Sequence, residues 1–289
     1  GLSTAANLLE QEPHAKVAIL ERGLLPSGAS TKNAGFACFG SLTELLDDIK
    51  TFGADTALAI VKARVNGLKK LCARINPELM DYQNHGGYEL LHERDQACLP
   101  ELSHINDWLA PLFPSPVFLL ANEQIARFGF STKHVSALIK NPFESQIHTG
   151  KMMRALIHHV QTLGASIITG AQVLSYQEHG DHVQIQVQQA SPKNEFIFKA
   201  KKLAICTNAF ATQLQSDLAI TPGRGQVIVT KPIPELKILG TFHAEQGYYY
   251  FRNIEDRVLL GGARHHDIKG ETTTDFGDNE LVLGSLKRF

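Results

Sequence analysis

The first 21 residues constrain the fold most, because they combine a helix of small residues with a short apolar strand that ends in an acid. Residues 2–11 place their apolar side chains near one helical face, and "KVAILE" at 16–21 has the continuous apolar character of a buried strand. Glu21 follows Gly1 by 20 residues. Dinucleotide folds use this spacing: a glycine-rich turn and the helix N-terminus hold the pyrophosphate, and an acid about 20 residues further on holds the ribose. Taken alone, the spacing does not exclude a helix–strand unit of an unrelated fold.

The rest of the chain alternates between helical and strand-rich segments. Apolar spacings of three and four predict helix over 41–75, ended by Pro77, and further helices over about 95–110 and 151–163. Strands are predicted for "GYELL", for three or four segments between Ala165 and Phe210 with a turn at "HGD", and for most of the last third, before a helix-like end.

The loop "RGLLPSGASTKNAGFACFGS" after Glu21 is too polar and glycine-rich to continue the strand. Glycines allow the backbone to approach a flat ring or a phosphate closely, and Ser30 and Thr31 offer hydroxyl donors. This stretch resembles the FAD-dependent D-amino-acid oxidase superfamily, which includes glycine oxidase and sarcosine oxidase. The matching residues are Gly1, Leu2 and Ser3 in the first element, Glu21 in the second, and Gly28, Ala29, Ser30, Asn33 and Gly35 in the loop.

The resemblance continues downstream. "GASIITGAQV" is similar to a family segment in which a strand residue, here Val173, contacts the adenine end through its backbone. "KKLAICTNAFATQL" resembles an apolar strand that turns close to the flavin, with Cys206-Thr207-Asn208 in place of the usual Ala-Thr-Gly. Asparagine tolerates the left-handed backbone that glycine would supply, so this turn can survive the substitution.

Two later segments resemble the family's substrate-domain strands. These are "TPGRGQVIVTKPI" and "GYYYFRNIEDRVLLGGAR", which make Tyr248, Tyr250 and Arg252 candidates for a substrate pocket. An arginine can pair bidentately with a carboxylate, and tyrosines can line an apolar slot. The alternative is that the tyrosines belong to an ordinary half-buried sheet and that Arg252 caps a turn with Glu255 or Asp256.

The resemblance implies an α/β fold (α+β overall), with a Rossmann-like FAD-binding domain interleaved with an antiparallel-sheet substrate domain. We expect the FAD-binding domain over 1–80 and 147–222 and the substrate domain over 81–146 and 223–289. Relatives have a strand before Gly1 and a segment after Phe289, so the chain is expected to be an internal fragment. The implied cofactor is FAD, and the candidate contacts are Gly1, Leu2, Ser3, Glu21, Arg22, Ser30, Thr31, Asn33, Ala34, Gly35, Val173, Thr207 and Asn208.

The implied activity is oxidation of the C–N bond of an amino acid or a secondary amine to an imine, with no catalytic acid or base identified. A redox-silent FAD-fold module that binds a nucleotide or a protein remains open, as does a flavin domain acting on a modified tRNA base. The 28 basic and 29 acidic residues nearly cancel, which argues against a nucleic-acid partner.

Composition and motif spacing limit the remaining possibilities. The four cysteines are scattered, which predicts reduced thiols and a cytoplasmic location. The groups His179-Asp181-His182 and His265-His266-Asp267 are more typical of polar turns than of a metal site, so no metal is expected. No apolar run reaches the length of about 18 residues that a membrane span needs.

Overall fold

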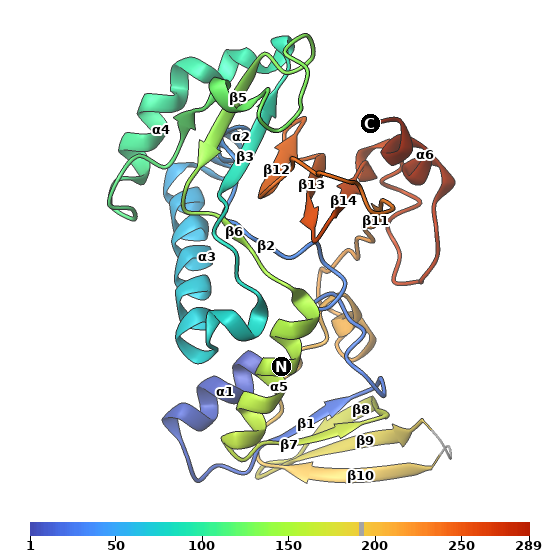
Figure 1. Ribbon diagram of the computed structural model, residues 1–289. Helices are drawn as coiled ribbons and strands as arrows, with labels where there is room; N and C mark the ends of the chain where they lie inside the picture. The colour runs from blue at the N-terminus through green and yellow to red at the C-terminus, as the bar shows by residue number, and fades with distance from the viewer. Residues whose placement is uncertain (191–193) are drawn as a thin grey trace. The chain divides into compact units, whose positions relative to one another are not determined.

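The computed structural model describes residues 1–190 and 194–289 and divides into two compact units (Figure 1). The first unit comprises 1–33, 149–223 and 272–275, and the second comprises 34–148, 224–271 and 276–289. Residues 34–80, which the sequence assigned to the FAD-binding domain, therefore belong to the second compact unit. Which unit carries which function remains a prediction.

The first unit is built on the helix–strand opening. Helix α1 (Leu2–Gln11) leads into β1 (Ala18–Glu21), and α5 (Thr149–Thr162) leads into β7 (Ser166–Thr169). Strands β1 and β7 pair in parallel, which sets the two helix–strand segments side by side. Ala6 and Leu9 of α1 and Val160 of α5 are buried in one apolar cluster. The small residues of α1 thus allow α1 and α5 to share one apolar cluster.

An antiparallel sheet completes the regular structure of this unit. It consists of β8 (Ala171–Glu178), β9 (Val183–Gln189) and β10 (Glu195–Ala200) in the order β10-β9-β8. The turn predicted at "HGD" is confirmed, with His179 N donating to the carbonyl of His182. A 3₁₀ helix, η4 (Asn208–Gln213), follows later in the chain.

The second unit centres on a seven-stranded mixed sheet. Its order is β11-β14-β13-β12-β3-β5-β4, and among the described strands of this sheet only the β12–β3 pair is parallel. The strands are β3 (Gly87–Leu91), β4 (Leu119–Leu120), β5 (Ala137–Asn141), β11 (Gln226–Val229), β12 (Thr241–Ala244), β13 (Tyr249–Ile254) and β14 (Arg257–Gly262). A separate pair joins β2 (Phe36–Ala37) to β6 (Ser145–Gln146).

Apolar clusters lie on both faces of this sheet. One face carries an aromatic cluster around Phe242 and Phe251, against which α6 (Glu280–Arg288) packs through Val282 and Leu286. Helices α2 (Leu42–Phe52), α3 (Ala54–Arg74) and α4 (Leu102–Leu109) contribute to the cluster around Leu91 and Ile139 on the other face. Short 3₁₀ helices complete the unit: η1 (Pro77–Met80), η2 (Glu93–Glu101), η3 (Asn122–Gln124) and η5 (Arg264–His266).

The mixed α and β class expected from the sequence is confirmed, while three local expectations need correction. The helical stretch 41–75 is two helices separated at Gly53, whose φ of +83° breaks the helical geometry. Over 95–110, η2 precedes α4, and η2 contains Pro100, which cannot donate a helical hydrogen bond. Residues 203–206 form no strand, because none of the described strands pairs with them.

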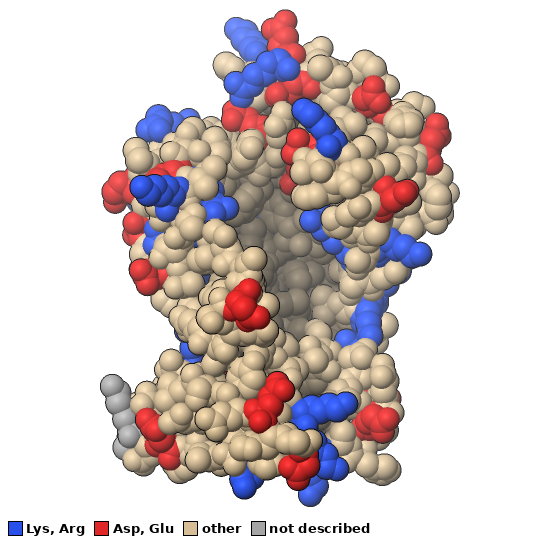
Figure 2. Space-filling model, turned by 180° about the vertical axis from the view of Figure 1, so that it is seen from behind, with Lys and Arg blue, Asp and Glu red and all other residues tan. Residues whose placement is uncertain are grey.

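Basic and acidic side chains are intermixed on the face of the molecule drawn in Figure 2. On the face shown in Figure 2, Lys and Arg side chains lie among Asp and Glu side chains and form no extended patch of one sign. None of the helices within the described ranges is long and apolar enough to cross a membrane. All four cysteines are free, as expected.

Candidate functional site

The N-terminus of α1 meets a segment some 200 residues away in the sequence. Gly1 lies against Cys206, with 3.8 Å between the position of a Cβ on Gly1 and the Cys206 Cβ, and the Thr4 hydroxyl lies 3.7 Å from the Cys206 sulfur. Thr207 and Asn208 follow Cys206 directly, so Gly1, Leu2 and Ser3 share one region with them. Asn208 has a φ of +48°, as the comparison with glycine led us to expect.

No side chain of the residues that the structure describes caps this helix, and no acid lies in its first turn. The first amides of a helix have no partner within the helix and carry the positive end of its dipole. The region is therefore suited to an anion such as a phosphate.

Glu21 is the last residue of β1 and Arg22 follows it, and their side chains contact different residues. The Oε1 of Glu21 accepts a hydrogen bond from Gly23 N at 2.8 Å, which holds its carboxylate at the strand end. The Arg22 guanidinium lies 3.8 Å from the ring centroid of Phe210, in a cation–π contact. Sequence reasoning missed Phe210, whose only signal was its place just after the Thr207-Asn208 turn.

Side-chain hydrogen bonds within residues 28–33 hold the conformation of the predicted loop. Thr31 Oγ1 donates to the carbonyl of Gly28 at 2.9 Å, and Asn33 Nδ2 donates to the carbonyls of Ala29 and Ser30. Gly28, Ala29 and Ser30 remain exposed. The matched residues thus build a compact turn whose backbone is accessible.

Val173 lies in β8, at the bulge between Val173 and Ser175. Its side chain packs against the apolar cluster of Ala171, Ile185 and Val187. Only its backbone is therefore left for the contact that the resemblance implies.

In the second unit, Gly35 lies against Arg252. Gly35 has a φ of +73°, and a Cβ there would approach the Arg252 Nη2 to 3.0 Å and would clash with the carbonyl of Ile147. Gly35 also accepts a hydrogen bond from Ile147 N at 2.8 Å. Only glycine fits this position. The loop residues Ala34 and Gly35 and the strand residue Arg252 are therefore brought together.

Arg252 is buried, with 5% of its surface exposed, and its Nε has no hydrogen-bond partner among the described residues. Burial lowers the pKa of the guanidinium, and the charge of Asp81 opposes this shift. The acid whose charge acts on Arg252 is Asp81, and not Glu255 or Asp256, the turn partners considered from the sequence. A buried guanidinium with an unpaired nitrogen is an incomplete site for an anion.

The two candidate tyrosines have different surroundings. Tyr250 is partly buried, its ring lies edge-on to Phe36 at 5.7 Å, and its ring covers Gly261. Burial raises the pKa of Tyr250. Tyr248 precedes β13, is 50% exposed and contacts the ring of His265. The structure therefore joins Tyr250 to the Arg252 region, while Tyr248 lies at the surface.

Sequence reasoning missed a row of polar side chains on the same face of the sheet. The strand register aligns Glu89 of β3 with His243 of β12, and His243 with Tyr250 of β13. Thr241 and Arg252 form the neighbouring row. A signal existed in the sequence, because Glu89 is the single acid of the apolar strand "GYELL".

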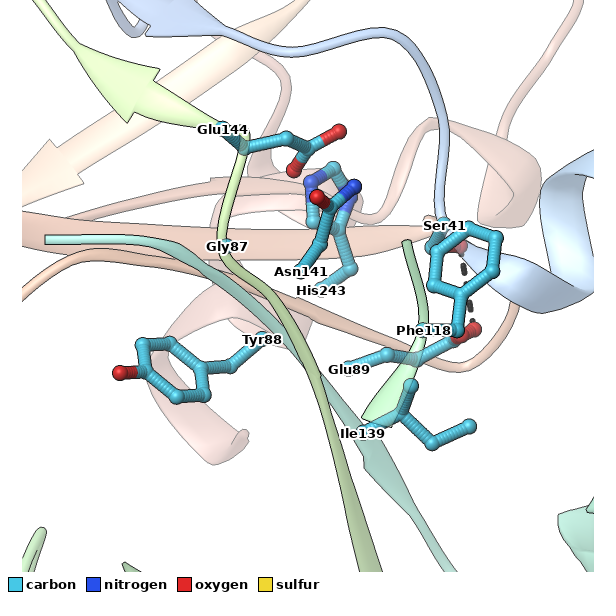
Figure 3. A pocket seen from close by; sticks show the side chains of 9 residues that line it. All are labelled: Ser41, Gly87, Tyr88, Glu89, Phe118, Ile139, Asn141, Glu144 and His243. Atoms are coloured by element: carbon cyan, nitrogen blue, oxygen red, sulfur yellow. Dashed lines mark hydrogen bonds between the residues drawn. The ribbon is translucent and has the colours of Figure 1, made fainter. Parts of the chain in front are cut away.

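Two buried carboxyls, Glu89 within this row and Glu144 beside it, hold the start of α2. Glu89 accepts hydrogen bonds from the hydroxyl of Ser41, as Figure 3 shows, and from the hydroxyl of Thr43. Glu144 accepts from the amides of Phe39 and Gly40. Burial raises the pKa of Glu89 to about 7 and that of Glu144 to about 8, although these hydrogen bonds act in the opposite direction. Both groups bind protons far more readily than exposed carboxyls do.

Of the histidine groups considered as metal ligands, His179 and His182 flank the turn between β8 and β9, and His265 and His266 lie in η5. In the described part of the chain, no group of three or more His, Cys, Asp or Glu side chains is placed to hold a metal ion. His182 instead contacts the adjacent Asp181, and His266 contacts the hydroxyl of Tyr249.

Comparison with known proteins identifies the class. The model of the FAD dependent oxidoreductase family matches residues 1–289, the whole chain. The chain therefore belongs to the D-amino-acid oxidase (DAO) family of FAD-dependent oxidoreductases, as the sequence resemblance implied, and FAD is the cofactor of this family. No curated protein matches the chain in sequence.

Solved structures share the fold at low sequence identity. Glycine oxidase from Geobacillus kaustophilus is 18% identical with a TM-score of 0.71, and the match covers 100% of this chain and 73% of that one. Iminodiacetate oxidase from Chelativorans sp. BNC1 is 17% identical with a TM-score of 0.71, covering 99% and 74% of the two chains. L-proline dehydrogenase from P. horikoshii is 15% identical with a TM-score of 0.70, covering 99% and 72%.

The residues of the first unit fit a dinucleotide cofactor. The uncapped N-terminus of α1 can receive a phosphate, and the Glu21 carboxylate at the end of β1 keeps Oε2 for a hydroxyl, since the hydrogen bond from Gly23 N uses only Oε1.

Proposed function

We propose that this protein, with FAD bound, oxidises the C–N bond of an amino acid or a secondary amine to an imine, and that Arg252 binds the substrate carboxylate. The family membership supports FAD-dependent oxidation, and the solved relatives include a glycine oxidase and an iminodiacetate oxidase. The choice of a carboxylate-bearing amine as substrate rests on this chain's own residues.

The observation that carries the proposal is the buried, incompletely paired guanidinium of Arg252. Removing a charged group from water costs free energy unless partners replace the water. A substrate carboxylate would supply two parallel hydrogen bonds to the guanidinium fork, one of them at the unpartnered Nε. Tyr250 and Phe36 provide apolar surface beside it for the rest of a small substrate.

The cofactor residues have separate proposed roles. The amides at Gly1, Leu2 and Ser3 would hold the pyrophosphate, and Glu21 the ribose hydroxyls. Arg22, Ser30, Thr31, Asn33, Ala34, Gly35, Val173, Thr207 and Asn208 would complete the FAD contacts, largely through the backbone. Bound FAD would supply the hydride acceptor.

The protein's own contribution is to orient the substrate and to favour its neutral amine. The carbon next to nitrogen loses hydrogen with its electron pair, while the nitrogen lone pair forms the C=N bond and an N–H proton leaves to solvent. Only the uncharged amine has that lone pair, and apolar surroundings disfavour the ammonium form. Water then adds to the released imine to give the carbonyl product and an amine or ammonia.

A small-molecule substrate is also more consistent with the charge distribution than a tRNA base would be. The formal net charge is −1, and nucleic-acid binding depends on concentrated positive charge.

A spectroscopic titration tests the proposal on the full-length protein. We expect a flavin absorbance spectrum once FAD is bound, and bleaching of that spectrum under anaerobic conditions by an amino acid or a secondary amine. A panel of such substrates would identify the preferred one. A protein that gains the flavin spectrum but is bleached by none of them would instead be the redox-silent module.

Substitution of Arg252 tests the substrate assignment. Arg252→Lys keeps the charge but removes the planar fork, so kcat/KM for the amino acid should fall about 100-fold. The matching amine without a carboxylate should change by less than about threefold. Arg94→Lys is the matched control, because Arg94 is exposed and pairs with Glu245. Equal losses on both substrates would show that Arg252 does not bind the carboxylate.

A further inference from the structure

A small polar cavity lies within the second unit, beside the row that contains His243. Its lining includes Asn141 at the end of β5, Glu144 just before β6, and His243 on β12. Figure 3 shows the amide of Asn141, the ring of His243 and the carboxyl of Glu144 pointing toward one another. The volume of about 10 Å³ is close to the smallest cavity that admits one water molecule.

Asn141 presents a hydrogen-bond donor to this cavity. Its Oδ1 accepts from Phe143 N at 3.0 Å, which fixes the orientation of the amide. The Nδ2 is buried and has no hydrogen-bond partner among the described residues. Asn141 itself is 4% exposed. An acceptor is therefore needed in the cavity, and a metal or alkali cation cannot provide one.

His243 and Glu144 supply the remaining polar atoms. The Nδ1 of His243 lies 3.7 Å from the carboxylate of Glu44, while its Nε2 is buried and lacks a partner within the described ranges. The Oε1 of Glu144 accepts from Phe39 and Gly40, and neither of these hydrogen bonds uses Oε2. The Oε2 lies against Gly87, where any Cβ would clash with it.

We propose that Asn141, His243 and Glu144 bind one buried water molecule in this cavity. The water oxygen accepts a hydrogen bond from Asn141 Nδ2, one water hydrogen is donated to His243 Nε2, and the water makes its third hydrogen bond with Glu144 Oε2. Buried waters make about three hydrogen bonds to groups of this kind. Neutral His243 can act as the acceptor at Nε2 when its Nδ1 proton faces Glu44.

The bound water connects strand β12 to the segment that begins α2. Glu144 touches the water through Oε2 and holds the amides of Phe39 and Gly40 through Oε1. One molecule of water thus completes the hydrogen bonding of three buried side chains. The inference does not depend on the proposed reaction.

A crystal structure of the full-length protein at a resolution that shows ordered water provides the first test. We expect a single density peak about 2.7–3.2 Å from Asn141 Nδ2, His243 Nε2 and Glu144 Oε2. A cavity without density would overturn the proposal. A crystal soaked in rubidium chloride distinguishes a cation site, since an anomalous peak at this position would also overturn it.

The variant His243→Phe provides the second test, because it retains an aromatic ring but removes the acceptor nitrogen. Magnetic relaxation dispersion of water ¹⁷O counts long-lived buried waters, and the count should fall by one relative to the wild type. His134→Phe is the matched control, since His134 is exposed in the same unit, and its count should not change. An unchanged count in His243→Phe would contradict the proposal. If this variant fails to fold, the density in the wild-type crystal decides.

Discussion

At the scale of single residues, the buried carboxyls Glu89 and Glu144 are a prominent electrostatic feature. Their pKa values of about 7 and about 8 lie well above those of a carboxyl in an unfolded chain. Between about pH 5 and pH 8, the folded protein therefore keeps protons on these two carboxyls that the unfolded chain has already released. Their contribution to stability is largest at the acidic end of this interval and is lost as the pH rises through the folded-state pKa values.

Glu144→Gln should weaken this pH dependence. The amide oxygen can still accept from Phe39 N, but the side chain no longer ionises. The wild type should lose on the order of 3 kcal/mol through Glu144 between about pH 5 and pH 8, and the variant should lack that part while keeping the part due to Glu89. Urea unfolding at several pH values measures the difference. Glu101→Gln, at an exposed position, is the control. Parallel profiles for Glu144→Gln and the wild type would refute the assignment.

A second residue-scale prediction concerns the ion pair of Arg224 and Glu271. Glu271 is fully buried and receives two hydrogen bonds from Arg224 and a third from Gln226. Glu271→Ala removes a fully buried acceptor of hydrogen bonds from Arg224 and Gln226 and should lower the free energy of unfolding by about 3 kcal/mol. In contrast, Arg94→Ala breaks an exposed pair and should cost less than about 1 kcal/mol. Chemical denaturation of both variants tests this, and similar losses would count against the buried pair.

At the scale of elements, Gly53 determines that residues 42–74 form two helices rather than one. It ends α2 and precedes α3 with φ +83° and ψ 154°, a region almost restricted to glycine. The apolar spacings continue through this point, so hydrophobic periodicity alone could not locate the break. The capping box of Ser41 and Glu44 marks the start of α2 more clearly.

The glycines Gly53 and Gly67 allow a matched test of this interpretation. A Cβ at either position would meet nothing within 4 Å, so packing does not differ between them. Gly53→Ala should lower the free energy of unfolding by about 1–3 kcal/mol through backbone strain. Gly67→Ala, inside α3, should raise it by about 0.5–1 kcal/mol. Thermal and urea unfolding provide the measurement, and stabilisation by Gly53→Ala would show that no special backbone is needed there.

At the scale of the whole molecule, cofactor binding should be visible as stability. A ligand that binds only the folded state raises the free energy of unfolding, by about 2.7 kcal/mol at 100 times its Kd. We expect FAD to raise the unfolding midpoint in a concentration-dependent way. Glu21→Ala should weaken this effect, because it removes the proposed ribose contact.

Glu178→Ala provides the control for this experiment, since Glu178 is an exposed acid in the same unit. Equal FAD-induced shifts in the two variants would show that Glu21 does not contribute to binding. No shift in the wild type at any FAD concentration would mean that the protein does not bind the cofactor.

The sequence by itself determined the family and the local elements around its motifs. The patterns that carried the prediction are local: the Gly1-to-Glu21 spacing, the loop from Gly28 to Gly35 and the Arg252 strand. Within such short segments, the residue types indicate the backbone conformation and the contacts that it can make. The family and the mixed α and β fold were predicted on these patterns and are confirmed. The roles of the individual site residues stay predictions.

Only the tertiary structure decided which distant residues meet. It brought Cys206 to the first helix, placed Arg252 beside Gly35, and aligned Glu89 with His243 and Tyr250 across three strands. Strand register and burial depend on the packing of the whole unit, because the same residue types suit either face of a sheet. The sequence could therefore identify Arg252 as a candidate, but its buried and unpaired nitrogen follows from the packing around it.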